Sequence, residues 1–216
     1  EAGNHPSILA WSVCNESATD TPGGAAYVKA LKEHVKALDP ERFVTYADDS
    51  AANAADPAAT AVVHADFMMM NQYFGSWAGP AELLAPRLER LGRLLPDKMI
   101  VISELGLAGI FAPDAIAADR RRVEILESQL DEFARHDFVG GAIFWCYQDY
   151  KSHRNLPPGQ ARGFVEMGLV DEWRQRRPSY DVWKRRNAPA HVRVSWHQPY
   201  TTPTEARVAI TPRSEN

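Results

Sequence analysis

Apolar residues gather in five short runs along the chain, and none of these runs alternates strictly between apolar and polar positions. Such runs are typical of strands that are buried on both faces of a parallel sheet. Each is rich in β-branched, aromatic or other apolar side chains. The pattern therefore predicts strands at residues 8–13, 43–47, 67–71, 99–103 and 141–147.

The stretches between the predicted strands have helical periodicity in three places. Apolar residues recur every three or four positions from Val28 to Leu38, where Asp39-Pro40 ends the helix. The same periodicity predicts a second helix from Leu84 to Leu95 and a third at residues 116–133. The connection between residues 47 and 67 has only weak helical signals, so we expect a loop with a short helix there. Alternating strands and helices indicate βα units, in either an open doubly wound sheet or part of a barrel.

The pattern changes after residue 150. Residues 151–163 are polar and contain Pro157-Pro158-Gly159, which is typical of a loop, and residues 164–173 suggest short extended pieces. A further helix is predicted from Pro178 to Arg186. Alternating apolar positions from about residue 190 suggest the first strands of a β-sandwich. We therefore divide the chain into an α/β domain at residues 1–188 and the beginning of a β-sandwich domain, or a linker, at residues 189–216.

The composition narrows the classes of partner. Of the 216 residues, 45% are hydrophobic and 24% are charged, which is the balance of a globular protein. The net charge of −4 gives no reason to expect nucleic acid or an anionic membrane as a partner. No apolar run reaches the length of about 18 residues that a membrane span needs. We expect no cofactor and no metal, and we interpret Cys14 and Cys146 as small apolar side chains rather than as a disulfide or metal site.

Two glutamates follow apolar strands in the same way. Glu16 ends the first predicted strand and Glu104 ends the fourth, so both would lie at the carboxyl-terminal rim where barrel enzymes place their catalytic groups. Retaining glycosidases need two carboxyl groups about 5–5.5 Å apart, one as nucleophile and one as acid/base. Glu104 would attack in its ionised form, and Glu16 would donate a proton and then take one from water. Once Glu104 is consumed in the covalent intermediate, its charge no longer favours protonated Glu16.

A long motif at the first strand resembles a known family. The stretch from Asn4 to Glu16, Asn-His-Pro-Ser-Ile followed by Trp and Asn-Glu, is similar to the acid/base signature of glycoside hydrolase family 2, which includes β-galactosidases and β-glucuronidases. Later segments follow in the family's order: Asn71-Gln72-Tyr73, Ile102-Ser103-Glu104 with Gly106, Phe144-Trp145 with Asp149, and Arg177-Pro178. The resemblance extends to about residue 188. It implies the C-terminal part of a catalytic (β/α)8 TIM barrel, with strands four to eight present.

The resemblance also implies roles for individual residues. Glu16 would be the acid/base and Glu104 the nucleophile, with Asn15 binding the sugar 2-hydroxyl. Tyr73 would donate a hydrogen bond to Glu104, and Asn71 would line the pocket. The remaining candidates are Trp145, as an apolar platform under the sugar ring, and the loop residues Asp149, His153 and Arg154, which would reach the substrate. His5 precedes a strand and is interpreted as structural.

The expected function is that of a retaining β-glycoside hydrolase with a carbohydrate as substrate. A β-galactosidase-like specificity is favoured, because residues 159–163 lack the Asn-x-Lys element with which β-glucuronidases recognise the uronate carboxylate. In a β-glucuronidase of this sequence, Arg154 or Arg162 would have to bind the uronate carboxylate instead. The alternatives are a β-glucuronidase or other exo-β-glycosidase, and a non-catalytic carbohydrate-binding barrel. An open-sheet enzyme of nucleotide chemistry is disfavoured, because no glycine-rich turn follows a predicted strand.

The start of the chain bears on its completeness. It begins at Glu1 without an initiator Met and enters a strand at once, so we interpret it as a fragment that lacks barrel strands one to three. The first and last strands would then have unpaired edges, and we expect the 216-residue polypeptide alone to be poorly soluble or inactive. A homo-oligomer of the full-length protein is left open. A cytoplasmic location is favoured, although the sequence does not determine the compartment.

Overall fold

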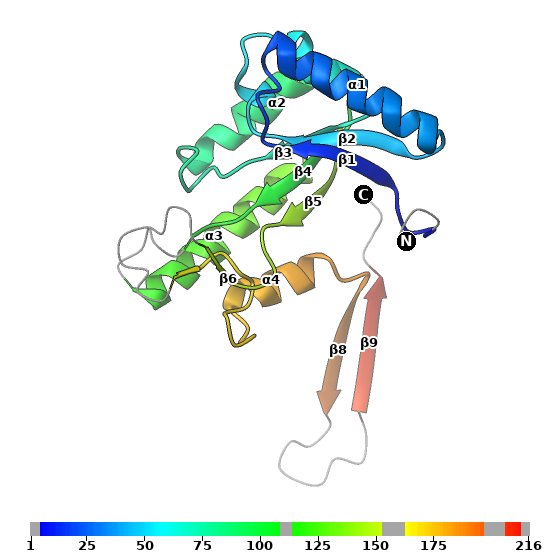
Figure 1. Ribbon diagram of the computed structural model, residues 1–216. Coiled ribbons are helices and arrows are strands. Elements are labelled where there is room, and N and C mark those ends of the chain that lie inside the picture. The colour runs from blue at the N-terminus through cyan, green and yellow to red at the C-terminus, as the bar shows by residue number, and fades with distance from the viewer. Residues whose placement is uncertain (1–4, 109–113, 153–162, 197–205, 213–216) are drawn as a thin grey trace.

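Five parallel strands form the central sheet of the computed structural model, which describes residues 5–108, 114–152, 163–196 and 206–212. Each strand pairs with its neighbour in the sequence, so the order across the sheet is also the chain order (Figure 1). Right-handed crossovers between successive parallel strands carry all the connecting helices to one face of the sheet. This is the arrangement of part of a (β/α)8 barrel, as predicted. The strands are β1 (Ala10–Asn15), β2 (Phe43–Asp48), β3 (Met68–Asn71), β4 (Ile100–Leu105) and β5 (Val139–Phe144).

Two of the helices begin after a residue whose side chain binds a free backbone amide. The side chain of Thr21 accepts a hydrogen bond from the amide of Gly24 at the start of α1 (Pro22–Leu38), and Asp114 does the same for α3 (Ala115–Phe133). The remaining helices are α2 (Leu84–Leu94) and α4 (Pro178–Arg186), which begins with a proline. None of the helices in the described ranges is long and apolar enough to cross a lipid bilayer.

The connection after β2 contains no full α-helix. It consists of three short 3₁₀ helices, η1 (Ala51–Asn53), η2 (Pro57–Ala59) and η3 (Ala61–His64). This agrees with the weak helical signal of the sequence. A fourth, η4 (Ala81–Leu83), leads into α2.

The main core lies between the sheet and helices α2 and α3. Met68, Leu88, Ile100 and Leu126 are all buried in it. β4 has neighbours on both sides and is buried on both faces, which explains its apolar sequence without alternation. β1 and β5 each have a single neighbour in the described chain and are more exposed than β2 to β4. The expected open edges are therefore found at both sides of this sheet.

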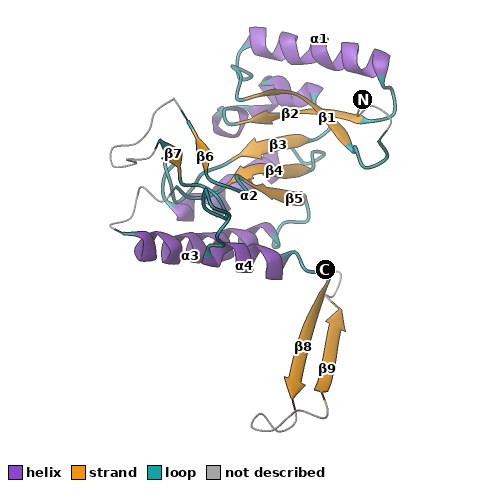
Figure 2. Cartoon of the chain, turned by 60° about the horizontal axis from the view of Figure 1, so that its bottom comes forward, coloured by secondary structure: helices purple, strands orange, loops and turns teal. Residues whose placement is uncertain are grey.

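Two small antiparallel units follow the sheet (Figure 2). β6 (Tyr150–Lys151) pairs with β7 (Phe164–Val165), and β8 (Ala190–Trp196) pairs with β9 (Ala206–Pro212). In the β8–β9 hairpin Val192 faces Ile210. The hairpin agrees with the alternating pattern of the sequence. That it opens a β-sandwich domain after residue 188 stays a prediction.

Candidate active site

Glu16 and Glu104 both lie at the carboxyl-terminal edge of the parallel sheet. Glu16 directly follows β1, and its amide donates a hydrogen bond to the carbonyl of Ala47 at 3.0 Å. Its φ of 46° lies in the left-handed region, which is uncommon for a residue other than glycine and recurs at functional sites. Glu104 lies near the end of β4, in register with Asn71 of β3. The chain folds so that the two acids meet at one edge, as the sequence predicted.

A cavity of about 510 Å³ opens at this edge. Both glutamates line it, together with four of the other predicted site residues. Those four are Asn15, Asn71, Tyr73 and Trp145. The remaining lining residues of the described chain are Asp49, Ala52, Asn53, Met70, Gln72, Phe74, Trp77, Ala78, Arg87, Tyr150 and Met167.

Asn71 connects the two halves of the site. Its amide nitrogen donates to Glu16 Oε1 at 2.8 Å and to Asn15 Oδ1 at 3.1 Å. The hydroxyl of Ser103 donates to Asn71 Oδ1 at 2.6 Å, which fixes the orientation of the amide. The Asn71 side chain also lowers the pKa of Glu104, with which Asn71 is paired across β3 and β4. One buried amide therefore lies beside both acids.

Tyr73 contacts the carboxylate of Glu104. Its hydroxyl donates a short hydrogen bond to Glu104 Oε2. Burial raises the pKa of Glu104 above its ordinary value, the Tyr73 hydrogen bond lowers it, and the negative charge of Glu16 raises it again, so that the net shift is upward. The pKa of Tyr73 is also raised, first by burial and then by Glu104, so the phenol stays a donor. The hydrogen bond from Tyr73 thus favours the ionised carboxylate that a nucleophile requires, against the effects of burial and of Glu16.

Replacing Tyr73 with Phe should therefore slow catalysis and shift its pH dependence. A hydrogen bond to a charged group contributes about 1.5–3 kcal/mol, so we expect kcat/KM to fall about tenfold to hundredfold. Because this bond lowers the pKa of Glu104, its loss raises that pKa. The acid limb of the pH profile of kcat/KM should then move to higher pH, and the profile on an aryl glycoside measures this.

Tyr27→Phe is the matched control for this substitution. Tyr27 is exposed on α1 and does not line the cavity. We expect its kcat/KM and acid limb to match those of the wild type. A Tyr73→Phe enzyme whose acid limb stayed in place would contradict the assigned contact.

Trp145 lies directly beyond β5 and is 40% exposed. Tyr150 packs against its indole edge-on, with ring centroids 5.9 Å apart. Gly106 allows the backbone of Trp145 to lie close to the end of β4, because a Cβ at position 106 would lie 2.4 Å from the carbonyl oxygen of Trp145. The peptide bond between Trp145 and Cys146 is cis. An indole on the cavity wall suits the C–H face of a sugar ring.

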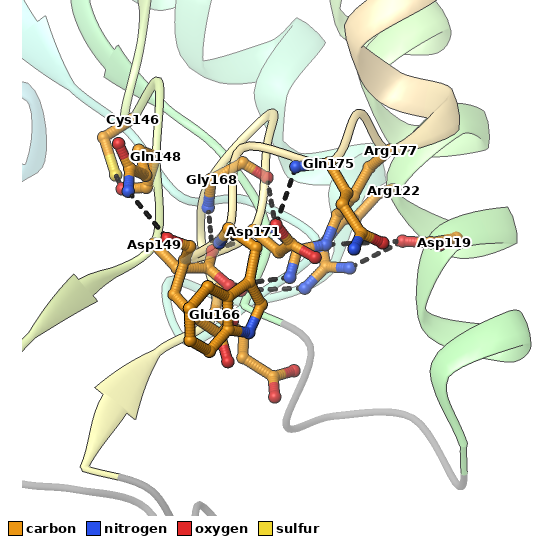
Figure 3. Close-up of polar contacts among 12 residues, drawn as sticks. Asp119, Arg122, Cys146, Gln148, Asp149, Glu166, Gly168, Asp171, Gln175 and Arg177 are labelled. Carbon is orange, nitrogen blue, oxygen red and sulfur yellow. Dashed lines mark hydrogen bonds and ion pairs between the residues drawn. The ribbon is translucent and has the colours of Figure 1, made fainter.

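Asp149 is not among the residues that line the cavity. It is buried, and both of its oxygens accept hydrogen bonds from Arg177, at 2.9 and 2.7 Å (Figure 3). The amide of Gly168 donates to it at 2.7 Å. Its surroundings are those of a structural ion pair that connects the loop after β5 to the start of α4.

The other loop candidates divide into two groups. His5 is exposed and outside the cavity, where its carbonyl accepts a hydrogen bond from Arg42 at 3.1 Å. Outside the described residues lie His153, Arg154, residues 159–162 and Asn4 of the first motif.

Cys14 and Cys146 are free thiols, and burial raises the pKa of Cys146 to about 11. Within the described ranges, no group of three or more His, Cys, Asp or Glu side chains could hold a metal ion.

The sequence did not point to several residues of the site. Ser103 was part of the motif around Glu104, yet nothing in the pattern connected its hydroxyl to Asn71. Asp49 and Trp77 each follow a predicted strand by a few residues, and this position after a strand was the only feature of the sequence that could have indicated them. Arg87 lies within an amphipathic helix, where an arginine is ordinary, so periodicity gave no sign that it reaches the cavity.

Comparisons with known proteins agree on one family. The family model described as glycosyl hydrolases family 2, TIM barrel domain, matches residues 1–192. A β-glucuronidase of Pongo abelii is 33% identical over 167 residues, which is 71% of this chain and 25% of that protein. A β-glucuronidase of Canis lupus familiaris is 32% identical over 209 residues, covering 88% of this chain and 31% of that protein. The chain thus spans about a quarter to a third of the length of these relatives.

Solved structures give the same fold. The crystal structure of Ruminococcus gnavus β-glucuronidase in complex with uronic isofagomine aligns with a TM-score of 0.73 and 24% sequence identity. The alignment covers 85% of this chain and 32% of that one. At this identity the likeness concerns the fold.

Proposed function

The chain belongs to glycoside hydrolase family 2, within its TIM barrel domain, and from this premise we propose that it carries the catalytic centre of a retaining β-glycoside hydrolase. The observation that carries the proposal is that both acids line one cavity at the edge of the sheet, where Asn71 donates a hydrogen bond to Glu16 and Tyr73 donates one to Glu104. Residues 1–188 would form part of the catalytic domain, and residues 189–216 the beginning of the next domain or a linker.

The first step forms a covalent intermediate. Glu104 attacks the anomeric carbon from the α face while Glu16 donates its proton to the glycosidic oxygen, and the bond between that oxygen and the anomeric carbon breaks. Tyr73 donates a hydrogen bond to Glu104, and this bond favours the ionised form of Glu104 before attack. Asn15, whose Oδ1 accepts a hydrogen bond from Asn71, would bind the sugar 2-hydroxyl.

The second step releases the sugar. Glu16 is now ionised and takes a proton from water, whose oxygen attacks the anomeric carbon from the β face. The bond from Glu104 to the sugar breaks, and the product keeps the β configuration. Trp145 supports the ring in both steps as an apolar platform.

We propose a β-glucuronide as the first candidate for the substrate. The support is that the relatives described above are β-glucuronidases, which favours this alternative over the β-galactosidase-like specificity expected from the sequence. A uronate carboxylate needs a cation beside it. Arg154 and Arg162 are the loop candidates in the sequence.

A neutral β-glycoside is the second candidate, and the charge of the cavity favours it. Glu16, Asp49 and Glu104 place three carboxylates on the described walls. The guanidinium of Arg87 lines the same cavity, and one of its nitrogens already donates to Asn53 Oδ1 and the carbonyl of Ala52. A negative cavity disfavours an anionic sugar unless a dedicated cation compensates.

A panel of 2-deoxy-2-fluoro β-glycosides with activated leaving groups tests both candidates in the full-length protein. We expect a covalent adduct on the peptide that contains Glu104, formed fastest with the glucuronide. Mass spectrometry identifies the peptide, and the inactivation rates rank the sugars. Fastest labelling by a neutral sugar would select the second candidate. Labelling of another carboxylate would remove Glu104 from the proposed role, and no labelling by any member would contradict the retaining mechanism.

A further inference from the structure

The cavity extends beyond the two glutamates toward the ends of β2 and β3. Asp49 follows β2, Trp77 lies in the loop after β3, and both line the cavity. Trp145 lies at the opposite side, beyond Glu104 and after β5. The volume of about 510 Å³ is within the range of about 300–1,000 Å³ that encloses drug-sized ligands. This leaves room for more than one sugar ring.

The position of Glu16 indicates which end receives the leaving group. An acid/base residue protonates the glycosidic oxygen, so the bond that breaks lies beside Glu16. The sugar that is attacked lies over Glu104 and Trp145, and the departing group extends away from them. Because β1 pairs with β2 and β2 with β3, the loops after β2 and β3 form the described part of the rim that follows Glu16 around the sheet, and a group that departs beside Glu16 would contact them.

Asp49 presents a carboxylate on this rim. It is exposed, and it accepts no hydrogen bond from another residue in the part of the chain that the structure describes. Desolvation and the negative charge of Glu16 both raise the pKa of Asp49, which agrees with its place beside the acid/base. Its backbone is held, because Asn53 donates to the Asp49 carbonyl at 2.9 Å and Arg87 donates to Asn53 Oδ1. The carboxylate is therefore free to bind, on a rim fixed by other residues.

Trp77 supplies an apolar surface on the same rim. Its side chain is 55% exposed, and its indole lies against the ring of Tyr73 with centroids 4.1 Å apart. The C–H face of a sugar packs on an indole, and sugar hydroxyls donate strong hydrogen bonds to a carboxylate. The pair thus combines the two kinds of contact by which a sugar is recognised.

We propose that Asp49 and Trp77 form a subsite for the leaving group and that this leaving group is an uncharged sugar. The natural substrate would then be a disaccharide or oligosaccharide. A carboxylate beside Glu16 repels an anionic leaving group, and an unsubstituted aromatic leaving group offers it no hydrogen-bond donor. The inference rests on the proposed retaining mechanism, since the same subsite binds an acceptor that resolves the covalent intermediate.

Reactivation of the trapped enzyme tests the subsite directly. The 2-fluoroglycosyl enzyme is freed of excess reagent and incubated in buffer alone or with the methyl β-glycosides of glucose, galactose or xylose. An acceptor hydroxyl attacks the anomeric carbon, its proton passes to Glu16, and the bond to Glu104 breaks. We expect at least one neutral acceptor to accelerate reactivation saturably over water. In Asp49→Ala this acceleration, as a ratio to the rate in water, should fall about tenfold or more.

Two further variants sharpen the result. Asp49→Asn keeps the size of the side chain and removes its charge, so methyl β-glucuronide should become a better acceptor than it is for the wild type. Trp77→Ala should also reduce the acceleration. Glu82→Ala and Trp173→Ala are matched controls, because both residues are exposed and outside the cavity, and their acceleration should match the wild type.

The outcomes separate the subsite from the proposed function. The yield of trapped enzyme measures whether each variant folds and whether the first step works. Trapping without any acceleration by a neutral sugar would overturn the subsite and leave the hydrolase intact. Full acceleration in both Asp49→Ala and Asp49→Asn would do the same. Failure to trap the wild type would overturn the proposed function and, with it, the subsite.

Discussion

Glu104→Ala in the full-length protein should lose turnover by about 10⁴-fold or more, the size of loss that follows removal of a group that acts as part of a catalytic unit. Added azide should restore activity on an activated aryl β-glycoside and form the α-glycosyl azide. The reason is geometric, because the deleted side chain leaves a space on the α face of the anomeric carbon. Azide attacks from that face while Glu16 still assists the leaving group, and one displacement inverts the configuration.

Glu16→Ala should give the opposite product. Glu104 remains and still forms the glycosyl enzyme from a substrate whose leaving group needs no proton. Azide then enters from the β face, where Glu16 stood, and the product is the β-glycosyl azide. Proton NMR of the anomeric position distinguishes the two azides.

Each substitution serves as a control for the other, because the two variants are expected to give glycosyl azides of opposite configuration. Glu82→Ala, an exposed acid outside the cavity, should change neither turnover nor product. A β-azide from Glu104→Ala would exchange the two roles. Undiminished turnover by both variants would exclude this pair of acids as the catalytic groups, whereas absence of turnover in the wild type would favour a non-catalytic, carbohydrate-binding barrel.

The sequence located both acids because their position follows from a regular feature. A strand of a parallel sheet that helices cover is largely apolar, so the first charged residue marks the place where it reaches the edge of the sheet. Glu16 and Glu104 are such residues. All strands of a parallel sheet end at the same edge, and that is enough to bring the two glutamates together without any information on distance.

The boundaries of the strands were harder to predict. The first strand was expected from residue 8, but β1 begins at Ala10, and Leu9 is 68% exposed. The fifth was expected from residue 141, but β5 begins at Val139 and includes Gly140. Glycine is disfavoured in strands. Here a Cβ at Gly140 would lie 2.4 Å from the sulfur of Met99, so tertiary packing outweighs the local preference.

The support of the site depends on contacts between distant residues, which periodicity does not reveal. Asn71 and Ser103 are 32 residues apart, and Asp149 and Arg177 are 28 apart. Asp149 follows a strand just as Glu16 does, and the same pattern led to the prediction that it reaches the substrate. Only the neighbouring Arg177 distinguishes a buried ion pair from a ligand.

Asp149→Ala should destabilise the protein by about 3–5 kcal/mol, because it removes both short hydrogen bonds of the Arg177 guanidinium to a carboxylate and leaves only the longer ion pair with Asp119 at 3.9 Å. The Asp149 side chain is 1% exposed and that of Arg177 is 14% exposed, so water replaces little of the lost contact. The same change also removes the acceptor of the Gly168 amide. Next to Gly168 is Met167, which lines the cavity, so the loss of this contact should also loosen one wall of the site.

The surface ion pair of Arg185 and Glu127 is the matched control. Their side chains are 53% and 43% exposed, and exposed pairs contribute at most about 1 kcal/mol, so Glu127→Ala should have little effect. Urea unfolding followed by tryptophan fluorescence measures both variants. For a domain of about 150–250 residues, a loss of about 3–5 kcal/mol corresponds to a fall in Tm of about 6–20 °C.

The same experiment decides between the two roles of Asp149. A residue that binds substrate raises KM when it is replaced and leaves unfolding nearly unchanged. A buried ion-pair partner lowers the free energy of unfolding whether or not substrate is present. A stability of Asp149→Ala equal to that of Glu127→Ala, together with a raised KM, would return Asp149 to the substrate site. The expected result, a large loss of stability, would instead assign it to the framework that holds Met167 against the cavity.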